Sequence, residues 1–226
     1  MEEKIRKMFN QVKINISDDQ AEKLFKFYQI LMRENEKYNL TAIKDFEEVV
    51  KKHFIDCALA LHYFHDKVLD VGSGAGFPGI VLAILNDKLE LTLLDSLNKR
   101  VNFLNMVKKE LDLSNITTLH SRIEDFKEKN SFDCVTARAV AELPTLLEYV
   151  LPFVKIGGRA IIYKGSNCFE EVEKSSDALK ILGGQLEEMS KYSLFDNLRT
   201  LVIVKKIFNT PLKFPRGGNL PRKNPL

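Results

Sequence analysis

The sequence predicts an α/β fold with a mostly parallel sheet, an antiparallel last strand and an N-terminal helical extension. Apolar residues recur at helical spacing in the first 64 residues, and short strands alternate with helical segments from residue 67 onward. Two final strand-like runs are joined by a link too short for a helix. We therefore expect helices over 1–64, an α/β core over 65–210 and a tail over 211–226.

The first 64 residues carry the usual signals of helix starts. Ser17-x-x-Gln20 fits a capping box, and Asp45-x-x-Glu48 is expected to open a second helix after a turn at 38–42. The apolar stripe that follows the capping box predicts core packing; it comprises Ala21, Leu24, Phe25, Tyr28, Leu31 and Met32.

The central part alternates strands with helices, which predicts a parallel sheet covered by helices on both faces. The expected strands are 67–71, 91–95, 116–120, 132–137 and 159–163. Gly157-Gly158 is expected to end the helix before the fifth strand.

The last two strands are expected at 186–193 and 199–207, with residues 194–198 between them. A link of this length only allows an antiparallel pair. An antiparallel final strand in an otherwise parallel sheet is typical of class I (Rossmann-like) methyltransferases, whereas a plain dinucleotide-binding fold does not need it.

The most informative stretch is residues 67–79, a strand followed by a glycine-rich turn and a helix former. Such a turn makes a nucleotide pocket, and residues 74–79 match the dinucleotide pattern G-x-G-x-x-G. Asp70 argues against a pyrophosphate, since a carboxylate beside the turn would repel phosphate. S-adenosylmethionine carries a cationic sulfonium and an ammonium and no phosphate, so the pattern favours it over NAD.

A second acid, Asp95, ends the next strand about 20 residues after the glycines. An acid at this position of a βαβ nucleotide site accepts hydrogen bonds from ribose hydroxyls. The alternative is an Asp that caps the helix after Ser96.

Composition excludes several classes of protein. Cys57, Cys134 and Cys168 are far apart and form no CxxC motif, so neither a disulfide framework nor a metal site is indicated. The absence of a signal peptide and of a long apolar run predicts a soluble cytoplasmic protein without a membrane partner. Nothing indicates an obligate dimer, so we expect a monomer.

The formal net charge is +3, and all of the excess is in the tail. The last 22 residues hold six of the 34 basic residues and no acid, which leaves 28 basic against 31 acidic residues elsewhere. A basic segment with Gly217-Gly218 suggests contact with phosphates, and a solvated, frayed terminus is the equal alternative.

Taken together, the motifs resemble those of the bacterial 16S ribosomal RNA guanine-N(7) methyltransferases, also called glucose-inhibited division protein B. The resemblance runs from about Asn35 to the C-terminus. It rests on Asn39-Leu-Thr, His53-x-x-Asp56, residues 69–79, Leu94-Asp-Ser96 with Lys99-Arg100, Arg122-Ile-Glu124, residues 136–141, Tyr163-Lys-Gly165 and Lys213-Phe-Pro-Arg216. The tail departs slightly, with Phe214 in place of Tyr, Asn219 in place of Gly and Asn224 in place of Lys.

The resemblance implies methyl transfer from S-adenosylmethionine to guanine N(7) in the decoding-region loop of small-subunit RNA. Gly72, Gly74 and Phe77 would bind the methionine end of the donor, and Ile123 and Glu124 the adenine. Asp95 would bind the ribose. Arg138, at the end of the fourth strand, would face donor and substrate; pairing with a surface acid such as Glu142 is its alternative role.

Guanine N(7) has a free lone pair, so methylation there releases no proton and requires no general base. We therefore expect catalysis by proximity and alignment, with no catalytic residue beyond Arg138 as a candidate substrate contact. Lys164, Lys213, Arg216, Arg222 and Lys223 are the candidate RNA contacts. The partner is 16S ribosomal RNA or the small ribosomal subunit, and because the RNA major groove is deep and narrow, the target is expected to be looped or splayed out.

Two other functions stay open on the sequence. The G-x-G-x-x-G frame allows an NAD(P)-dependent oxidoreductase, and the pocket could also serve a non-catalytic binding module on the assembling ribosome.

Overall fold

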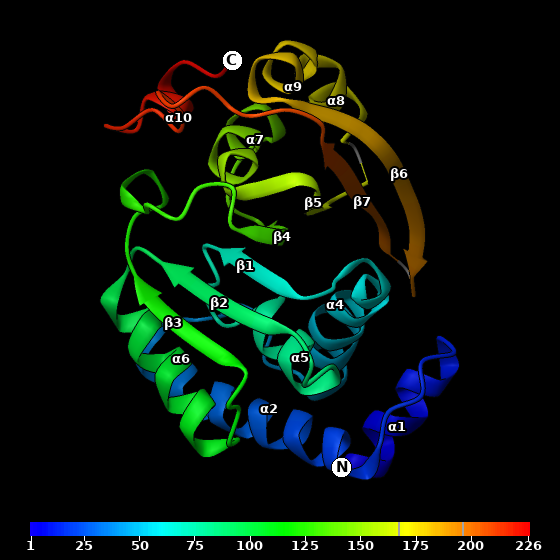
Figure 1. The fold of residues 1–226 in the computed structure, drawn as a ribbon. Coiled ribbons are helices and arrows are strands. Elements are labelled where there is room, and N and C mark those ends of the chain that lie inside the picture. The colour runs from blue at the N-terminus through cyan, green and yellow to red at the C-terminus, as the bar shows by residue number, and fades with distance from the viewer. Residues whose placement is uncertain (167, 196) are drawn as a thin grey trace.

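The computed structural model describes residues 1–166, 168–195 and 197–226. In this part of the chain a seven-stranded sheet has the order β3-β2-β1-β4-β5-β7-β6. Its strands are β1 (Lys67–Val71), β2 (Glu90–Asp95), β3 (Ile116–His120), β4 (Phe132–Arg138), β5 (Val154–Lys164), β6 (Gly184–Leu194) and β7 (Asn197–Lys206). The five predicted parallel strands are confirmed, and helices cover both faces of the sheet (Figure 1).

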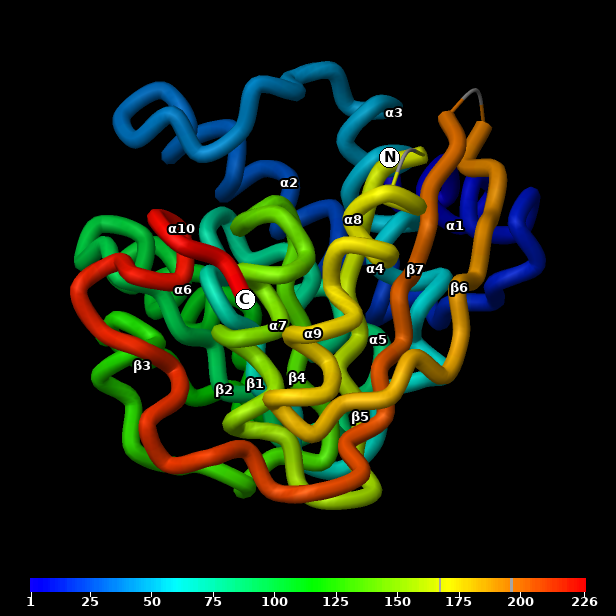
Figure 2. The backbone as a smooth tube through the Cα atoms, turned by 90° about the horizontal axis from the view of Figure 1, so that it is seen from above, coloured from blue at the N-terminus to red at the C-terminus, as the bar shows by residue number. Residues whose placement is uncertain are grey.

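The predicted antiparallel end of the sheet is confirmed as well. β7 runs antiparallel to both β5 and β6, and both hairpin strands are longer than expected. The hairpin forms one edge of the sheet (Figure 2). Asp196, in the predicted link, lies outside the described residues.

The N-terminal helices pack on the same face of the sheet as α5 (Gly79–Leu85) and α6 (Asn98–Glu110). They are α1 (Glu2–Gln11), α2 (Asp18–Tyr38), α3 (Phe46–Val49), a π-helical segment (Val50–Ile55), α4 (Asp56–Leu59) and a 3₁₀ turn (Leu61–Tyr63). The capping box at Ser17 is present, and Asp45 caps α3 through the backbone N–H of Glu48. One apolar cluster joins Phe27 and Phe54 to Phe77 and Leu104, so these helices share a core with the sheet.

The other face of the sheet is covered by α7 (Leu143–Val150), α8 (Phe169–Lys174) and α9 (Ser176–Leu182). Short 3₁₀ turns lie at Ile123–Asp125 and Leu151–Phe153, and α10 (Leu220–Lys223) ends the chain near α7. A second apolar cluster joins Leu146 and Val150 of α7 to Phe214 of the tail.

The expectation for Gly157-Gly158 was wrong. Both residues lie inside β5, where the pairing register with β4 shifts between Phe132 and Cys134. Gly157 has a φ of +87°, and a Cβ on Gly158 would lie 2.5 Å from the carbonyl oxygen of Asp133. The pair therefore forms a bulge early in the strand rather than a helix end.

All three cysteines are free and buried. Among the helices of the described residues, none has the length and hydrophobicity needed to cross a bilayer.

Candidate donor and substrate site

The glycine-rich turn after β1 is fixed to the carboxyl end of β2. The backbone N–H of Gly72 donates to Leu94 O at 2.8 Å, and that of Gly74 donates to Asp95 Oδ2 at 2.9 Å. The other oxygen of Asp95 accepts from the N–H of Leu97 at 2.9 Å, ahead of α6. The carboxylate of Asp95 therefore holds both the glycine-rich turn and the start of α6 in place.

Asp70 lies fully buried beneath this turn. Its Oδ2 accepts from the backbone N–H of Gly79, the first residue of α5, at 3.1 Å. In a dinucleotide fold the pyrophosphate occupies the start of this helix, and here a side-chain carboxylate takes that place. Oδ1 of Asp70 has no hydrogen-bond partner, and burial raises the pKa of this carboxyl to about 7.

Two cavities meet at Gly72, at the carboxyl edge of the sheet. The first, of about 140 Å³, is lined among others by Ile123 and Glu124, and the second, of about 180 Å³, by Gly74, Phe77 and Arg138. Six of the seven predicted donor-binding residues therefore line one of the two cavities. The residues that line the two cavities fit a nucleoside with an extended polar chain, because the residue that both cavities share, Gly72, has no side chain.

Gly72 itself shows why the position requires glycine. Its φ is +71°, and a Cβ there would lie 2.9 Å from Cγ2 of Val140 on the far wall. A side chain at this position would therefore clash with Val140, which lines the cavity of Ile123 and Glu124.

Asp95, the seventh predicted residue, lies just beneath the cavity wall and is 1% exposed. Its two oxygens accept the backbone bonds described above, and Arg100 Nη1 lies 3.4 Å from Oδ2. Oδ2 thus accepts two hydrogen bonds, and Oδ1 retains a further lone pair. Its role in binding ribose stays a prediction.

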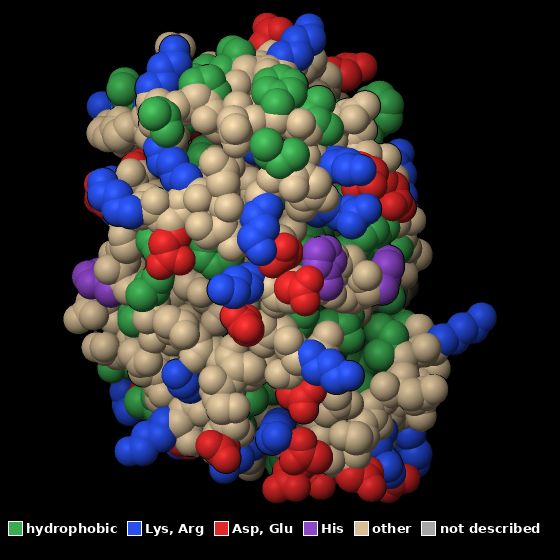
Figure 3. All heavy atoms as spheres, in the orientation of Figure 1, with side chains coloured by type: hydrophobic (Ala, Val, Ile, Leu, Met, Phe, Trp, Pro, Cys, Tyr) green, Lys and Arg blue, Asp and Glu red, His purple; other side chains and the backbone are tan. Residues whose placement is uncertain are grey.

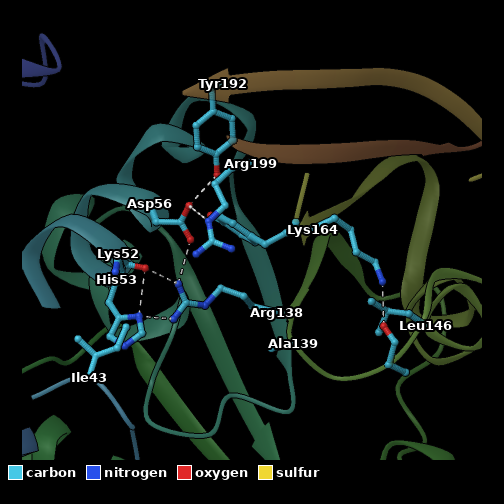
Figure 4. A pocket seen from close by; sticks show the side chains of 13 residues that line it. Ile43, Lys52, His53, Asp56, Arg138, Ala139, Leu146, Lys164, Tyr192 and Arg199 are labelled. Atoms are coloured by element: carbon cyan, nitrogen blue, oxygen red, sulfur yellow. Dashed lines mark hydrogen bonds and ion pairs between the residues drawn. The ribbon is translucent and has the colours of Figure 1, made fainter. Parts of the chain in front are cut away.

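A third cavity, of about 310 Å³, shares His53, Arg138 and Ala139 with the cavity at Phe77. Its walls come from distant parts of the chain: Lys52 and Asp56 near the N-terminus, Tyr163 and Lys164 at the end of β5, and Tyr192 and Arg199 on the β6–β7 hairpin (Figure 4).

Asp56 is the centre of the polar network in this cavity. Its Oδ2 accepts from Arg138 Nη1 at 3.0 Å, and its Oδ1 accepts from the Tyr192 hydroxyl at 2.8 Å. Figure 4 shows the carboxylate between these two partners. Arg138 is thereby held with its guanidinium 5.1 Å from the ring centroid of Phe77, a cation–π arrangement. Asp56, rather than Glu142, is the partner of Arg138.

His53 is held neutral beside this network. Its ring stacks on Phe77 with the centroids 4.4 Å apart, and Nδ1 lies 2.8 Å from Arg138 Nη2. Nδ1 also lies 3.1 Å from Lys52 O, and Nε2 lies 3.1 Å from Thr41 Oγ1, so both ring nitrogens have polar partners. Burial, followed by the charge of Arg138, lowers the pKa of His53 to about 3.

Residues 20–199 match the model of one protein family, rRNA small subunit methyltransferase G (GidB). The Ribosomal RNA small subunit methyltransferase G of Acetivibrio thermocellus is 48% identical over 224 residues, which cover 94% of this chain and 91% of that protein. The protein of the same name from Clostridium beijerinckii is 45% identical and covers 95% of this chain and 94% of its own length.

The chain belongs to the rRNA small subunit methyltransferase G family. The resemblance inferred from the motifs is thereby confirmed.

Solved structures of lower identity share the fold of this family member. A SAM dependent methyltransferase from Aquifex aeolicus superposes with a TM-score of 0.54 at 19% identity, covering 71% of this chain and 93% of that one. A ribosomal protein L11 methylase from Lactobacillus delbrueckii subsp. bulgaricus gives 0.55 at 16% identity, with coverages of 70% and 79%. The predicted class I methyltransferase fold is confirmed.

The five predicted RNA contacts of this methyltransferase G family member lie in different surroundings. Lys164 lines the third cavity, and its Nζ lies 2.9 Å from Ala141 O and 2.5 Å from Glu171 Oε2. Arg216 pairs with the fully buried Glu148, Nη2 to Oε2 at 2.6 Å, which anchors the tail on α7. Lys213 and Lys223 are exposed. Contact of these residues with RNA stays a prediction.

The residues of the third cavity that were not predicted as site residues include the polar His53, Asp56, Tyr192 and Arg199. The motif His53-x-x-Asp56 was a usable signal, because it places two polar groups within an otherwise apolar helical stripe. Tyr192 and Arg199 carry no such signal, since their place beside Arg138 depends on how the hairpin packs.

Proposed function

We propose that this chain transfers a methyl group from S-adenosylmethionine to N(7) of a guanine in the decoding-region loop of 16S ribosomal RNA. The proposal includes a monomeric enzyme acting in the cytoplasm on the RNA or on the small ribosomal subunit. The helices of 1–64 and the core of 65–210 would form the donor and substrate cavities, and the tail of 211–226 would contribute further residues to their walls.

The observation that carries the RNA partner is the charge of the three cavities. Among the described residues, seven cations and two acids line them: Lys52, Arg100, Arg122, Arg138, Lys164, Arg199 and Arg222 against Asp56 and Glu124. On the outer face drawn in Figure 3, by contrast, Lys and Arg are intermixed with Asp and Glu. A polyanion is therefore attracted to the cavities rather than to the whole surface.

The donor is S-adenosylmethionine, which supplies an electrophilic methyl group on a sulfonium. Ile123 and Glu124 would hold the adenine, and Asp95 the ribose through the remaining lone pair of Oδ1. Gly72 lines both donor cavities, and Gly74, Phe77 and Arg138 would hold the methionine end.

The third cavity would receive the substrate guanine, since it shares Arg138 and His53 with the donor cavity. N(7) needs no deprotonation, and the site fits this chemistry: His53 is neutral, and both of its ring nitrogens are already bonded. The residues would act by alignment, which can contribute roughly 7–11 kcal/mol. A base already unpaired in a loop costs least to place in such a cavity.

The test is transfer of labelled methyl from S-adenosylmethionine to small-subunit RNA, and to small subunits, from a strain that lacks the modification. Chromatography of the nucleosides should show label in 7-methylguanosine. Label in another nucleoside would overturn the proposed target atom, and no transfer to either substrate by folded protein would favour the binding module. The dinucleotide oxidoreductase has no support from the family, and Asp70 occupies the place of its pyrophosphate.

A further inference from the structure

The tail of 211–226 is docked on α7 by buried contacts. Phe214 is 3% exposed and packs in the second apolar cluster. The backbone N–H of Arg216 donates to Glu148 Oε1 at 2.7 Å, and the hydroxyl of Thr145 donates to Pro221 O at 2.9 Å. These contacts involve the main chain of the tail, so its path is fixed independently of its exposed side chains.

This path brings α10 to the cavity of Ile123 and Glu124. Asn219 and Arg222 line that cavity together with Glu124, and Arg222 Nη2 donates to Val140 O at 2.8 Å. Val140 is the residue that a Cβ on Gly72 would meet at 2.9 Å. The tail therefore forms one wall of the cavity assigned to adenine.

The backbone at the start of this wall is that of a tight turn. Gly218 and Asn219 have φ values of +66° and +63°, and a Cβ on Gly217 or Gly218 would meet nothing within 4 Å. The turn is thus open to solvent on one side, while α10 lies against the cavity. A segment held at Glu148 and turning at 217–219 can close over a ligand without unfolding the core.

We propose that the tail is a lid on the adenosine end of the donor site, with Asn219 and Arg222 as donor-binding residues. The chemistry suits a purine nucleoside: a guanidinium stacks on an aromatic plane, and an amide both donates to and accepts from the edge of a base. The inference rests on the proposed function for the donor, and it gives Arg222 a ligand other than RNA.

The experiment compares Arg222→Ala with Lys223→Ala, a matched control. Both substitutions remove one positive charge from α10, and Lys223 is exposed and does not line the cavity. Calorimetry should show a dissociation constant for S-adenosylhomocysteine about tenfold higher in Arg222→Ala and within about twofold of wild type in Lys223→Ala. Equal affinities in the two variants would overturn the lid.

A second measurement uses the unaltered chain, so it does not depend on the folding of a variant. S-adenosylhomocysteine should slow hydrogen exchange at the backbone amides of 216–224, and unchanged exchange would overturn the lid even if methyl transfer to RNA is observed. If S-adenosylhomocysteine protects the tail from hydrogen exchange but no methyl transfer is observed, only the proposed activity would be overturned. Failure of the wild type to bind the ligand would overturn both.

Discussion

Asp56, just after the π-helical segment, holds Arg138, at the last position of β4, with 3.0 Å between Oδ2 and Nη1. The two residues are 82 positions apart and belong to the N-terminal helices and the sheet. The pair positions the guanidinium at the boundary between the donor cavity and the third cavity.

Asp56→Ala is expected to destabilise the chain strongly, because it leaves the guanidinium of Arg138, whose side chain is only 16% exposed, without its carboxylate. The expected loss in the free energy of unfolding is about 3–5 kcal/mol, measured by urea denaturation. Glu187→Ala is the control, since Glu187 pairs with Arg159 at 2.7 Å on the surface and should cost at most about 1 kcal/mol. Similar losses in the two variants would contradict the role assigned to Asp56.

His53 should make stability depend on pH. Its pKa is about 3 in the folded chain against 6.5 ordinarily, so the unfolded chain binds a proton that the folded chain excludes. The stabilisation is complete above about pH 6.5 and is lost toward pH 3, at up to about 1.4 kcal/mol per pH unit. Urea unfolding of wild type and His53→Gln at several pH values should show their difference change with this slope. A difference independent of pH would show that His53 titrates normally in the folded chain.

Asp70 should release a proton when a cationic donor binds. Burial raises the pKa of this carboxyl to about 7, and a sulfonium above the turn favours its ionised form. Binding enthalpies at pH 7 in buffers of different ionisation enthalpy should reveal more proton release with S-adenosylmethionine than with S-adenosylhomocysteine. Asp70→Asn should abolish the excess while preserving an acceptor for Gly79. Equal proton release by the two ligands in wild type would rule out this coupling.

Gly72→Ala should weaken donor binding and stability together. The positive φ costs about 1–2 kcal/mol with a side chain, and the added Cβ lies 2.9 Å from Val140, which lines one of the donor cavities. Gly165→Ala is the control, because its Cβ would meet nothing within 4 Å. Calorimetry with S-adenosylhomocysteine and thermal unfolding would check both effects. Unchanged affinity in Gly72→Ala would mean that the donor does not pass this residue.

Local patterns were sufficient to predict the positions of the strands along the chain and the glycine-rich turn. Period-two and helical periodicity, the spacing from Gly72 to Asp95 and the short link before residue 199 are properties of neighbouring residues, and the structure confirms the elements they predict. Gly157-Gly158 shows the limit of this reasoning. Two glycines can end a helix or form a bulge equally well. Which of the two structures forms depends here on Asp133 in the neighbouring strand β4.

The site is harder to predict because its members meet only through packing. His53, Arg138 and Tyr192 come from three parts of the chain, and no spacing rule relates them. The tail makes the same point for charge. In the sequence Arg216 is one of several cations in a basic segment. In the fold its guanidinium forms an ion pair with the buried carboxylate of Glu148 in α7. A count of charges cannot distinguish an anchor from a free contact.

The burial of Cys57, Cys134 and Cys168 has a practical consequence. The native chain presents no accessible thiol to a maleimide dye, so an introduced cysteine would be the single labelling position. Lys223→Cys would place a fluorophore on α10 without altering the packed core. Its emission would follow the tail in real time, and mixing with RNA and donor in either order would reveal which of them this segment meets first.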